Sequence, residues 1–230
     1  MPFFIIFIKK LMRVFASLFF VFYIGIGFSQ QETQPVVDSL FREDQFYVSV
    51  SYNVLQKRPE YFNQYSFSTG LSAGFLRDFP ISKNRKWSIA PGIGYSFNDL
   101  KQTIDLSSIS TDPNSQLVTS KILLHYIDLP LEIRWRNATP ESHKFWRIYG
   151  GFVASYLVNG SLQYDGDLGS ETGTINNILN KFQYASYLTF GFNTWNAYIH
   201  YGLTPFFDTS KTASVNNMTS LKIGLMFYIL

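Results

Sequence analysis

One stretch of the chain, Leu124–Asn137 (LHYIDLPLEIRWRN), alternates apolar and charged residues almost without a break. Successive side chains of a β-strand point to opposite faces, whereas a helix would scatter such residues around its circumference. The stretch therefore predicts a strand with one apolar and one ionic face. The ionic face carries Asp128, Glu132, Arg134 and Arg136. The apolar face carries Ile127, Leu129, Leu131, Ile133 and Trp135.

The same alternation recurs along the chain and predicts a set of antiparallel strands. No segment after residue 29 keeps a helical period. Most alternating segments are about 9–13 residues long, which is the length of tilted strands that cross a bilayer and exceeds the 5–6 residues of ordinary strands. The eight expected strands are 46–55, 67–75, 87–97, 121–137, 146–158, 182–192, 195–203 and 221–230.

The composition of the two faces indicates which one points outward. One face is nearly continuous Leu, Ile, Val and Phe, and the other is mostly Gly, Ala, Ser, Tyr and Asn. A soluble, lipocalin-like barrel is the alternative, but such a barrel would present Lys, Glu and Thr to water. Charged residues make up 15% of the chain, against about 25% in soluble domains. We therefore predict an all-β, eight-stranded antiparallel up-and-down transmembrane β-barrel in the outer membrane of a Gram-negative bacterium.

The connections between the expected strands alternate in length, as they do in outer-membrane barrels with long outer loops and short periplasmic turns. The long connections contain Ser, Thr, Asn and Asp without a basic cluster. We expect them to contact other envelope proteins, while the wall contacts outer-membrane lipid and lipopolysaccharide. These predicted extracellular loops are 99–120, 159–181 and 204–220. Tryptophans at strand ends beside the short connections predict a periplasmic aromatic girdle: Trp87, Trp135, Trp146 and Trp195.

Charged residues with inward parity predict the content of the lumen. An eight-stranded barrel is just wide enough for side chains to fill it, and a charge buried there is very costly unless it is paired. We expect a network of salt bridges and tyrosines that plugs the barrel. Its predicted charged members are Asp128, Glu132, Arg134, Arg147, His200 and Lys222. Pro91 and Pro130 predict bulges, because each removes an N–H from the ladder.

The N-terminal segment has the layout of a secretory signal peptide. Three basic residues precede an apolar run at 14–28, and small residues occupy positions −3 and −1 of a cut after Ser29. The run is short for a membrane-spanning helix, which needs about 20 residues, although a retained signal anchor is the alternative. The predicted organisation is a signal peptide at 1–29, a flexible lead-in at 30–44 and the barrel domain at 45–230.

Charge and composition argue against several functional classes. Residues 1–29 contain three of the 19 basic residues and none of the 16 acidic ones, which leaves equal numbers in the remainder. The electrostatic argument for binding nucleic acid is therefore lost. Cysteine is absent, which excludes disulfides, thiolate metal sites and a lipid anchor on an N-terminal cysteine. No phosphate loop, nucleophile elbow or zinc spacing occurs, so we expect no metal, no cofactor and no enzymatic activity.

His125 supports the one enzymatic alternative. Its parity matches that of Leu123 and Ile127, so it is expected to face lipid near the outer interface. A lipid-facing histidine with a serine partner could act on lipopolysaccharide, but the sequence has no His-x-Ser pairing there. A narrow porin is the other alternative.

Three segments carry a resemblance to a known family. FSTGLSAGFLRDFPI, KWSIAPGIGYSF and HYIDLPLEIRWR resemble strands of the PorT-like outer-membrane β-barrel (porin) family of Bacteroidota. The last is similar to that family's strand of Tyr-hydrophobic-x-x-Pro-Leu ending in basic residues, and the likeness spans 30–230. The chain ends in MFYIL, which departs from the terminal aromatic residue that is typical of barrel assembly signals. The resemblance implies an outer-membrane barrel and, for some members, a role in type IX secretion and gliding. We expect a non-enzymatic scaffold or accessory subunit in protein secretion or envelope assembly.

Overall fold

The computed structural model describes most of the chain beyond the N-terminal segment, and all of the described residues belong to one unit, Leu40–Leu230. The predicted signal peptide at 1–29 and the lead-in at 30–44, apart from Asp44, lie outside the described residues. The described residues are 44–59, 62–64, 66–105, 117–137, 146–166, 169–208, 210 and 217–229.

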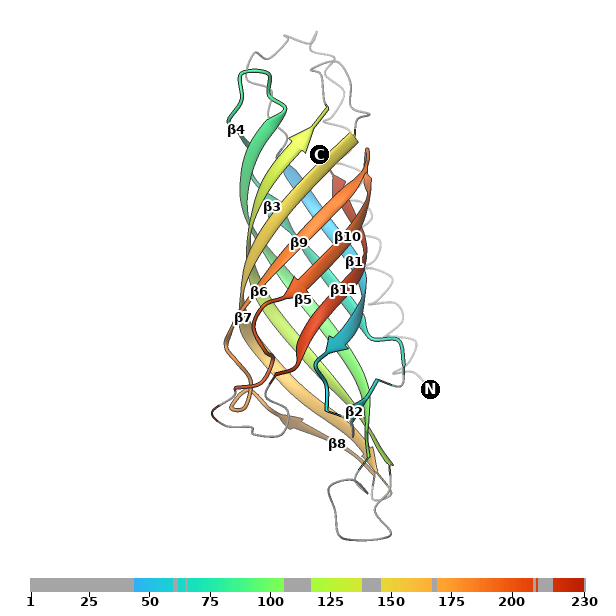
Figure 1. Cartoon of the computed structure of the whole chain (residues 1–230). Helices are drawn as coiled ribbons and strands as arrows, with labels where there is room; N and C mark the ends of the chain where they lie inside the picture. Colours follow the sequence, from blue (N-terminus) through green and yellow to red (C-terminus); the bar gives the residue numbers. More distant parts are fainter. Residues whose placement is uncertain are drawn as a thin grey trace, which may run out of the picture. The chain divides into compact units, whose positions relative to one another are not determined.

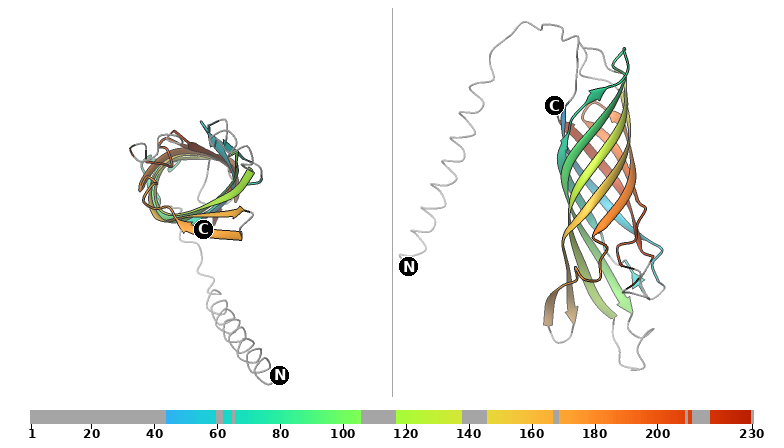
Figure 2. Two further views of the ribbon diagram at one scale, coloured as in Figure 1. Left: turned by 90° about the horizontal axis from the view of Figure 1, so that it is seen from below. Right: turned by 90° about the vertical axis from the view of Figure 1, so that its left-hand side faces the viewer.

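Within this part of the chain, eight long strands form a closed antiparallel barrel (Figures 1 and 2). Each long strand pairs with its neighbours in chain order, and β11 closes the ring by pairing with β1. The barrel strands are β1 (Gln45–Gln56), β3 (Thr69–Leu76), β5 (Trp87–Asp105), β6 (Leu117–Arg136), β7 (Trp146–Gly166), β9 (Phe182–Phe192), β10 (Trp195–Gly202) and β11 (Thr219–Ile229). The short strands β2 (Phe62–Asn63) and β4 (Phe79–Pro80) pair with β5, and β8 (Gly169–Thr174) pairs with β7. The predicted eight-stranded up-and-down barrel is confirmed.

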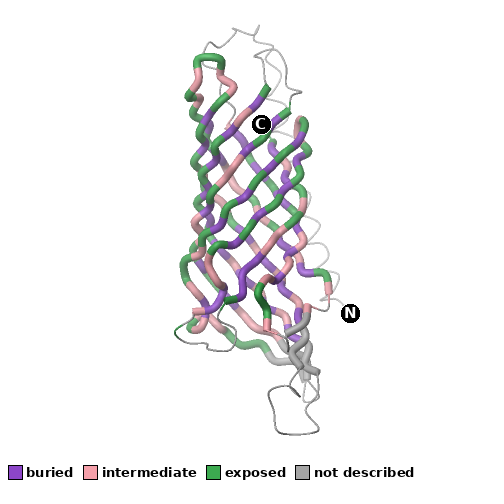
Figure 3. The backbone as a smooth tube through the Cα atoms, viewed as in Figure 1, coloured by how far each residue is buried: buried purple, intermediate pink, exposed green. Residues whose placement is uncertain are grey.

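Burial alternates residue by residue along the barrel strands, most regularly in β9 and β10 (Figure 3). Large apolar side chains point outward: Phe46 is 60% exposed and Ile133 is 56% exposed. Inward positions hold tyrosine, serine, asparagine and charged side chains. Soluble monomers rarely expose apolar patches larger than a few hundred Å², because each Å² left in water costs about 25 cal/mol. The outer wall is therefore suited to lipid.

The two ends of the barrel differ. β1 begins where β11 ends, since Phe46 lies opposite Ile229. We call this the terminal end, which is at the top of Figure 1, and the opposite end the loop end. The connection 77–86, which contains β4, lies at the terminal end. The two-residue turn between β9 and β10 lies there too, and in it Asn193 has φ 56°, a conformation that asparagine tolerates better than most residues.

Three strands continue past the barrel at the loop end. β5, β6 and β7 are 19, 20 and 21 residues long, against 8 to 12 residues in the other barrel strands. Their extensions stay paired and form, together with β8, a sheet beyond the rim (Figure 1). We call it the outer sheet. It consists of residues 99–105, 117–123, 161–166 and 169–174.

The outer sheet corrects two of the predicted extracellular loops. The segments 99–120 and 159–181 are largely strand in the described residues, with Lys101 opposite Lys121 and Ser161 opposite Thr174. The outward positions change from apolar to polar once the strands leave the apolar band of the wall. Backbone pairing between the strands continues there without apolar residues at the outward positions. The alternation of apolar and polar residues that predicts the rest of the barrel therefore does not predict the outer sheet.

The bulges predicted at Pro91 and Pro130 are a second correction. Pairing between β5 and β6 lapses for two residues opposite Pro130 and then resumes in the same register. Pro130 is thus accommodated by a gap in the ladder rather than by an extra residue. Within the described ladders between β6 and β7, the register shifts instead between His125 and Tyr126.

Inward-facing glycines provide room for two tyrosines of the lumen. Gly151 of β7 lies between Tyr187 of β9 and Glu132 of β6 in the ladder. A Cβ at Gly151 would overlap the Tyr187 ring. Glycine therefore lets that ring cross β7, and its hydroxyl donates to Glu132 Oε1 at 2.8 Å. Tyr47 lies in the same way against glycines of β3 and β5.

The adjacent Gly150 and Gly151 form a matched pair for a stability test. Gly151→Ala is expected to lower the free energy of unfolding by about 1–3 kcal/mol, the usual cost of overpacking, because Tyr187 must move. A Cβ at Gly150 meets nothing within 4 Å, so Gly150→Ala should change stability by less than about 0.5 kcal/mol. Urea unfolding of both variants in lipid vesicles measures this difference. Equal losses would contradict the role of Gly151.

Candidate functional site

Ion pairs fill the lumen toward the terminal end. Glu132, Arg134 and Arg136 point inward from β6 and are fully buried. Arg134 Nε donates to Glu132 Oε2 at 2.7 Å, and its Nη1 lies 3.3 Å from Asp78 Oδ1. Arg136 Nη2 lies 2.9 Å from Asp78 Oδ2. Two carboxylates and two guanidiniums therefore alternate across the lumen. We call these four residues, together with Arg147, the charge cluster.

Tyrosines complete the surroundings of the charge cluster. The hydroxyls of Tyr187 and Tyr228 both donate to Glu132 Oε1, each at 2.8 Å. The Tyr149 ring lies 4.9 Å from the Arg134 guanidinium carbon, and the Arg147 guanidinium lies 5.8 Å from the Tyr149 and Tyr228 rings. Because a buried charge is costly without hydrogen bonds, these contacts stabilise the buried charges of the cluster.

Asp78 is the member of the charge cluster that sequence reasoning missed. It lies in the connection after β3, is fully buried, and accepts a hydrogen bond from Ser88 Oγ at 2.6 Å. Its backbone N–H donates to Asp44 Oδ1 at 2.9 Å. Strand parity identifies only residues on strands, so it could not place Asp78. Inward-facing arginines near Glu132 outnumber inward-facing carboxylates, and this excess was the sequence signal that a further carboxylate had to come from elsewhere.

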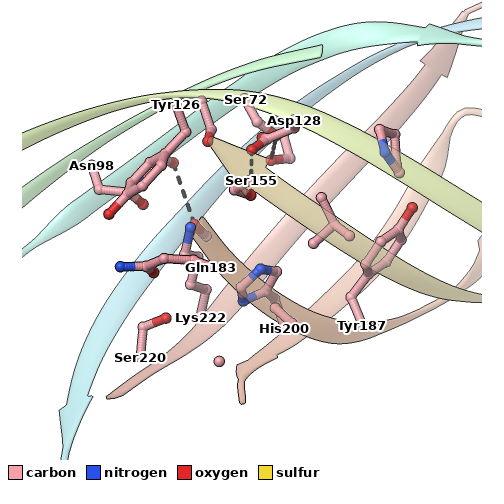
Figure 4. Close-up of a pocket in the computed structure, with 18 of the residues that line it drawn as sticks. Ser72, Asn98, Tyr126, Asp128, Ser155, Gln183, Tyr187, His200, Ser220 and Lys222 are labelled. Atoms are coloured by element: carbon pink, nitrogen blue, oxygen red, sulfur yellow. Dashed lines mark hydrogen bonds between the residues drawn. The ribbon is translucent and has the colours of Figure 1, made fainter. Parts of the chain in front are cut away.

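The other predicted lumen charges lie apart from the charge cluster. Asp128, His200 and Lys222 face a cavity of about 50 Å³ in the middle of the barrel (Figure 4). Ser155 Oγ donates to Asp128 Oδ1 at 2.6 Å, and His200 lies opposite Lys222 in the ladder. The structure thus divides the expected single network into two groups, the charge cluster and this cavity.

The cavity walls contain polar atoms that lack protein partners. Within the described residues, Tyr126 Oη, Gln183 Nε2 and His200 Nδ1 are buried without a hydrogen-bond partner in the protein. A water needs roughly 10–15 Å³ and two to four polar partners. The cavity therefore has the size and lining for a few ordered waters and is too small for an organic substrate.

An apolar plug fills the lumen at the loop end. Wall residues and residues from two connections form one buried cluster: Leu55, Leu100, Ile122, Leu124, Tyr126, Leu157, Leu179, Phe206, Phe207 and Met218. Leu179 and Phe207 form a β-bridge, and Phe206 N–H donates to Met218 O at 2.9 Å. Asn180 Nδ2 donates to the carbonyls of Pro205 and Phe207, both at 3.0 Å. The described ends of the predicted loop 204–220 are therefore packed into the mouth of the barrel.

The predicted girdle tryptophans all point outward at the terminal end. Trp87 lies opposite Trp135 in the ladder. Trp146 stacks on Phe190 with ring centroids 5.3 Å apart. The ring centroids of Trp195 and Phe227 are 4.8 Å apart. Their side chains are exposed or half-buried. An interfacial aromatic girdle requires outward tryptophans at one end of the barrel, and the periplasmic girdle itself stays a prediction.

His125 lies on the outer wall toward the loop end. Its Nδ1 is 2.5 Å from Tyr95 Oη, and its ring centroid is 5.0 Å from that of Phe97. Among the described residues, the imidazole thus bonds to a tyrosine hydroxyl rather than to a serine nucleophile. In the same part of the chain, no group of three or more histidine, aspartate or glutamate side chains could hold a metal ion.

Residues 28–208 match the model of the family described as outer membrane protein beta-barrel domain. The chain belongs to this family and is an outer-membrane β-barrel protein of a Gram-negative bacterium. In such barrels the short turns face the periplasm and the longer connections face outward, which places the terminal end at the periplasm. Over the described residues, no helix is both long and apolar enough to span a membrane.

Comparison with solved structures finds distant likenesses. Ail, the attachment invasion locus protein of Yersinia pestis, is 13% identical, with 82% of this chain and 99% of Ail covered at a TM-score of 0.39. Ail in complex with the heparin analogue sucrose octasulfate is 11% identical at the same TM-score and coverage. A mutant porin of Rh. blastica is 8% identical, with 82% and 100% covered at a TM-score of 0.16. No curated protein matches the chain in sequence.

Proposed function

We propose that the protein is a non-enzymatic scaffold or accessory subunit of the outer membrane, which presents its outer sheet to other envelope proteins. The observation that carries this proposal is the filled lumen. The charge cluster occupies the periplasmic half and the apolar plug occupies the outer mouth, with a cavity of about 50 Å³ between them. A narrow porin would need a continuous path between these ends. The surfaces left for function are the outer sheet and the wall.

The outer sheet supports contact with a protein or glycan. Connections held by a rigid barrel are usual places for recognition, and this sheet is a regular continuation of the barrel strands. Its outward positions include the ion pair of Lys121 Nζ with Asp99 Oδ2 at 3.4 Å, beside Lys101 and Gln163. Both signs of charge are present, so an anionic polymer is a poorer fit than a protein of mixed polarity.

The PorT-like resemblance directs the proposal toward secretion. Members of that Bacteroidota family include accessory proteins of type IX secretion and gliding, so we propose a role in protein secretion or envelope assembly after export through the signal peptide at 1–29. The contact of His125 with Tyr95 supports an interfacial role for this histidine rather than a catalytic one. Mass spectrometry of lipid A from cells with His125→Ala distinguishes the scaffold from the enzymatic alternative. The enzymatic alternative requires that the substitution change the lipid A of the cell.

Trimming the β7–β8 hairpin tests the proposal. Replacing 164–171 by Asn-Gly joins Gln163 to Thr172, which already lie opposite each other, with a turn suited to a two-residue hairpin. The barrel and the apolar plug are left intact, so folding and the heat-modifiable gel shift should match those of the unaltered protein. Association with surface partners in a mild-detergent pull-down should be abolished.

The matched control for this trimming is Thr194→Gly, which places the same Asn-Gly sequence at the periplasmic turn of β9 and β10. It should leave the recovered partners unchanged. The proposal is wrong if the trimmed protein folds and still recovers the same partners, with secretion and growth unaltered.

A further inference from the structure

The outer wall has a notch near the terminal end, where a side chain is missing from the apolar surface. Gly150 faces outward between Ile133 of β6 and Leu188 of β9, and a Cβ there meets nothing within 4 Å. The notch has a volume of about 660 Å³, and the backbone of Gly150 and Gly151 with the Tyr187 ring lies at its floor. Its sides are Trp87, Trp135, Leu131, Ile133, Ile148 and Phe152.

A cationic turn adjoins the notch. The segment 82–86 reads SKNRK and leads directly into Trp87, which lines the notch. The turn is held in place because Trp87 N–H donates to Ser82 Oγ at 3.0 Å and Arg136 N–H donates to Lys86 O at 2.9 Å. Lys83 is exposed and Lys86 is half-buried. The nearby Asp78 is buried against arginines in the lumen, so it does not neutralise the turn.

We propose that the notch and the turn together bind one glycerophospholipid of the inner leaflet. Its acyl chain lies over Gly150, and Lys83 and Lys86 contact the phosphate of its headgroup. The notch lies at the height of the tryptophans, where the hydrocarbon of the membrane meets the headgroups. An apolar groove that ends in cations matches the two parts of a phospholipid, since burial favours the chain and lysine is a good partner for phosphate.

This occupant fits better than a second protein. The wall of another copy is apolar, and over the described barrel strands its outward positions at this height carry no carboxylate to meet Lys83 and Lys86. An acyl chain is flexible enough to fill a notch one side chain deep and restores the contacts that an empty gap would forfeit. The bound lipid would thus complete the wall where the sequence has Gly150.

Lipid retention tests the proposal. The protein is folded into vesicles of mixed phosphatidylglycerol and phosphatidylethanolamine, extracted in mild detergent, and examined by native mass spectrometry. Wild-type protein is expected to retain one phospholipid and to prefer phosphatidylglycerol. Gly150→Leu fills the notch and should lower occupancy roughly tenfold or more, because the buried length of chain is lost. Lys83→Gln with Lys86→Gln should abolish the preference for the anionic headgroup.

Ala154→Leu is the matched control, because Ala154 also faces lipid on β7 but lies outside the notch. It should retain phospholipid as the wild type does. Equal occupancy in the wild type and Gly150→Leu would overturn the proposal, as would an equal loss in Ala154→Leu. Retention of a second copy of the chain, or of no added mass at all, would also overturn it.

Discussion

Replacing Glu132 by alanine is expected to destabilise the barrel by about 3–5 kcal/mol, the cost of removing one partner of a buried ion pair. Arg134 loses its 2.7 Å contact, and the hydroxyls of Tyr187 and Tyr228 lose their shared acceptor. Urea unfolding in lipid vesicles measures the loss. The heat-modifiable gel shift should occur at a lower temperature than in the wild type.

Two further variants separate the contributions of Glu132. Glu132→Gln keeps an oxygen for the tyrosine hydroxyls but removes the charge, so its loss should be smaller than that of the alanine variant. Glu132→Leu combined with Arg134→Met should recover much of the stability, since apolar replacement of a buried pair is often neutral. An unchanged gel shift in Glu132→Ala would mean that the lumen is hydrated and that the pair is solvated.

Replacing Asp78 by alanine is expected to cost a similar 3–5 kcal/mol. Its carboxylate is shared by Arg134 and Arg136 and also accepts from Ser88, so its loss leaves two buried guanidiniums with fewer partners. Asp99→Ala is the matched control, because its partner Lys121 has a side chain 37% exposed. An ion pair at such a site contributes about 0–1 kcal/mol. Equal losses of stability in the two variants would contradict the role of Asp78 as a shared partner of the two arginines.

The barrel could be predicted from the sequence because its main signal is local. Period-2 alternation in segments such as Leu124–Asn137 depends only on the pleat of a strand, and it gave both the eight strands and the inward direction of Glu132 and Arg134. The apolar outer face followed from the same pattern. Neither step required knowledge of which residues meet across the lumen.

The features that escaped prediction depend on contacts between distant segments. Asp78 reaches the arginines from a connection, and parity has no meaning outside strands. Leu179 and Phe206 come from short apolar groups in polar connections, so no period marks them as part of a plug. The division of the lumen follows from strand register around the barrel, because Asp128 and Glu132 are four residues apart on one strand and so lie at different heights.

We propose that the protein is closed to solutes and acts through its surface. Single-channel recording in planar bilayers tests it most directly, with a general porin reconstituted in the same way as a positive control. The plug and the charge cluster predict no conductance steps at either polarity while the porin conducts. Stable, reproducible steps from the purified protein, larger in a Phe206→Ala variant, would contradict the account.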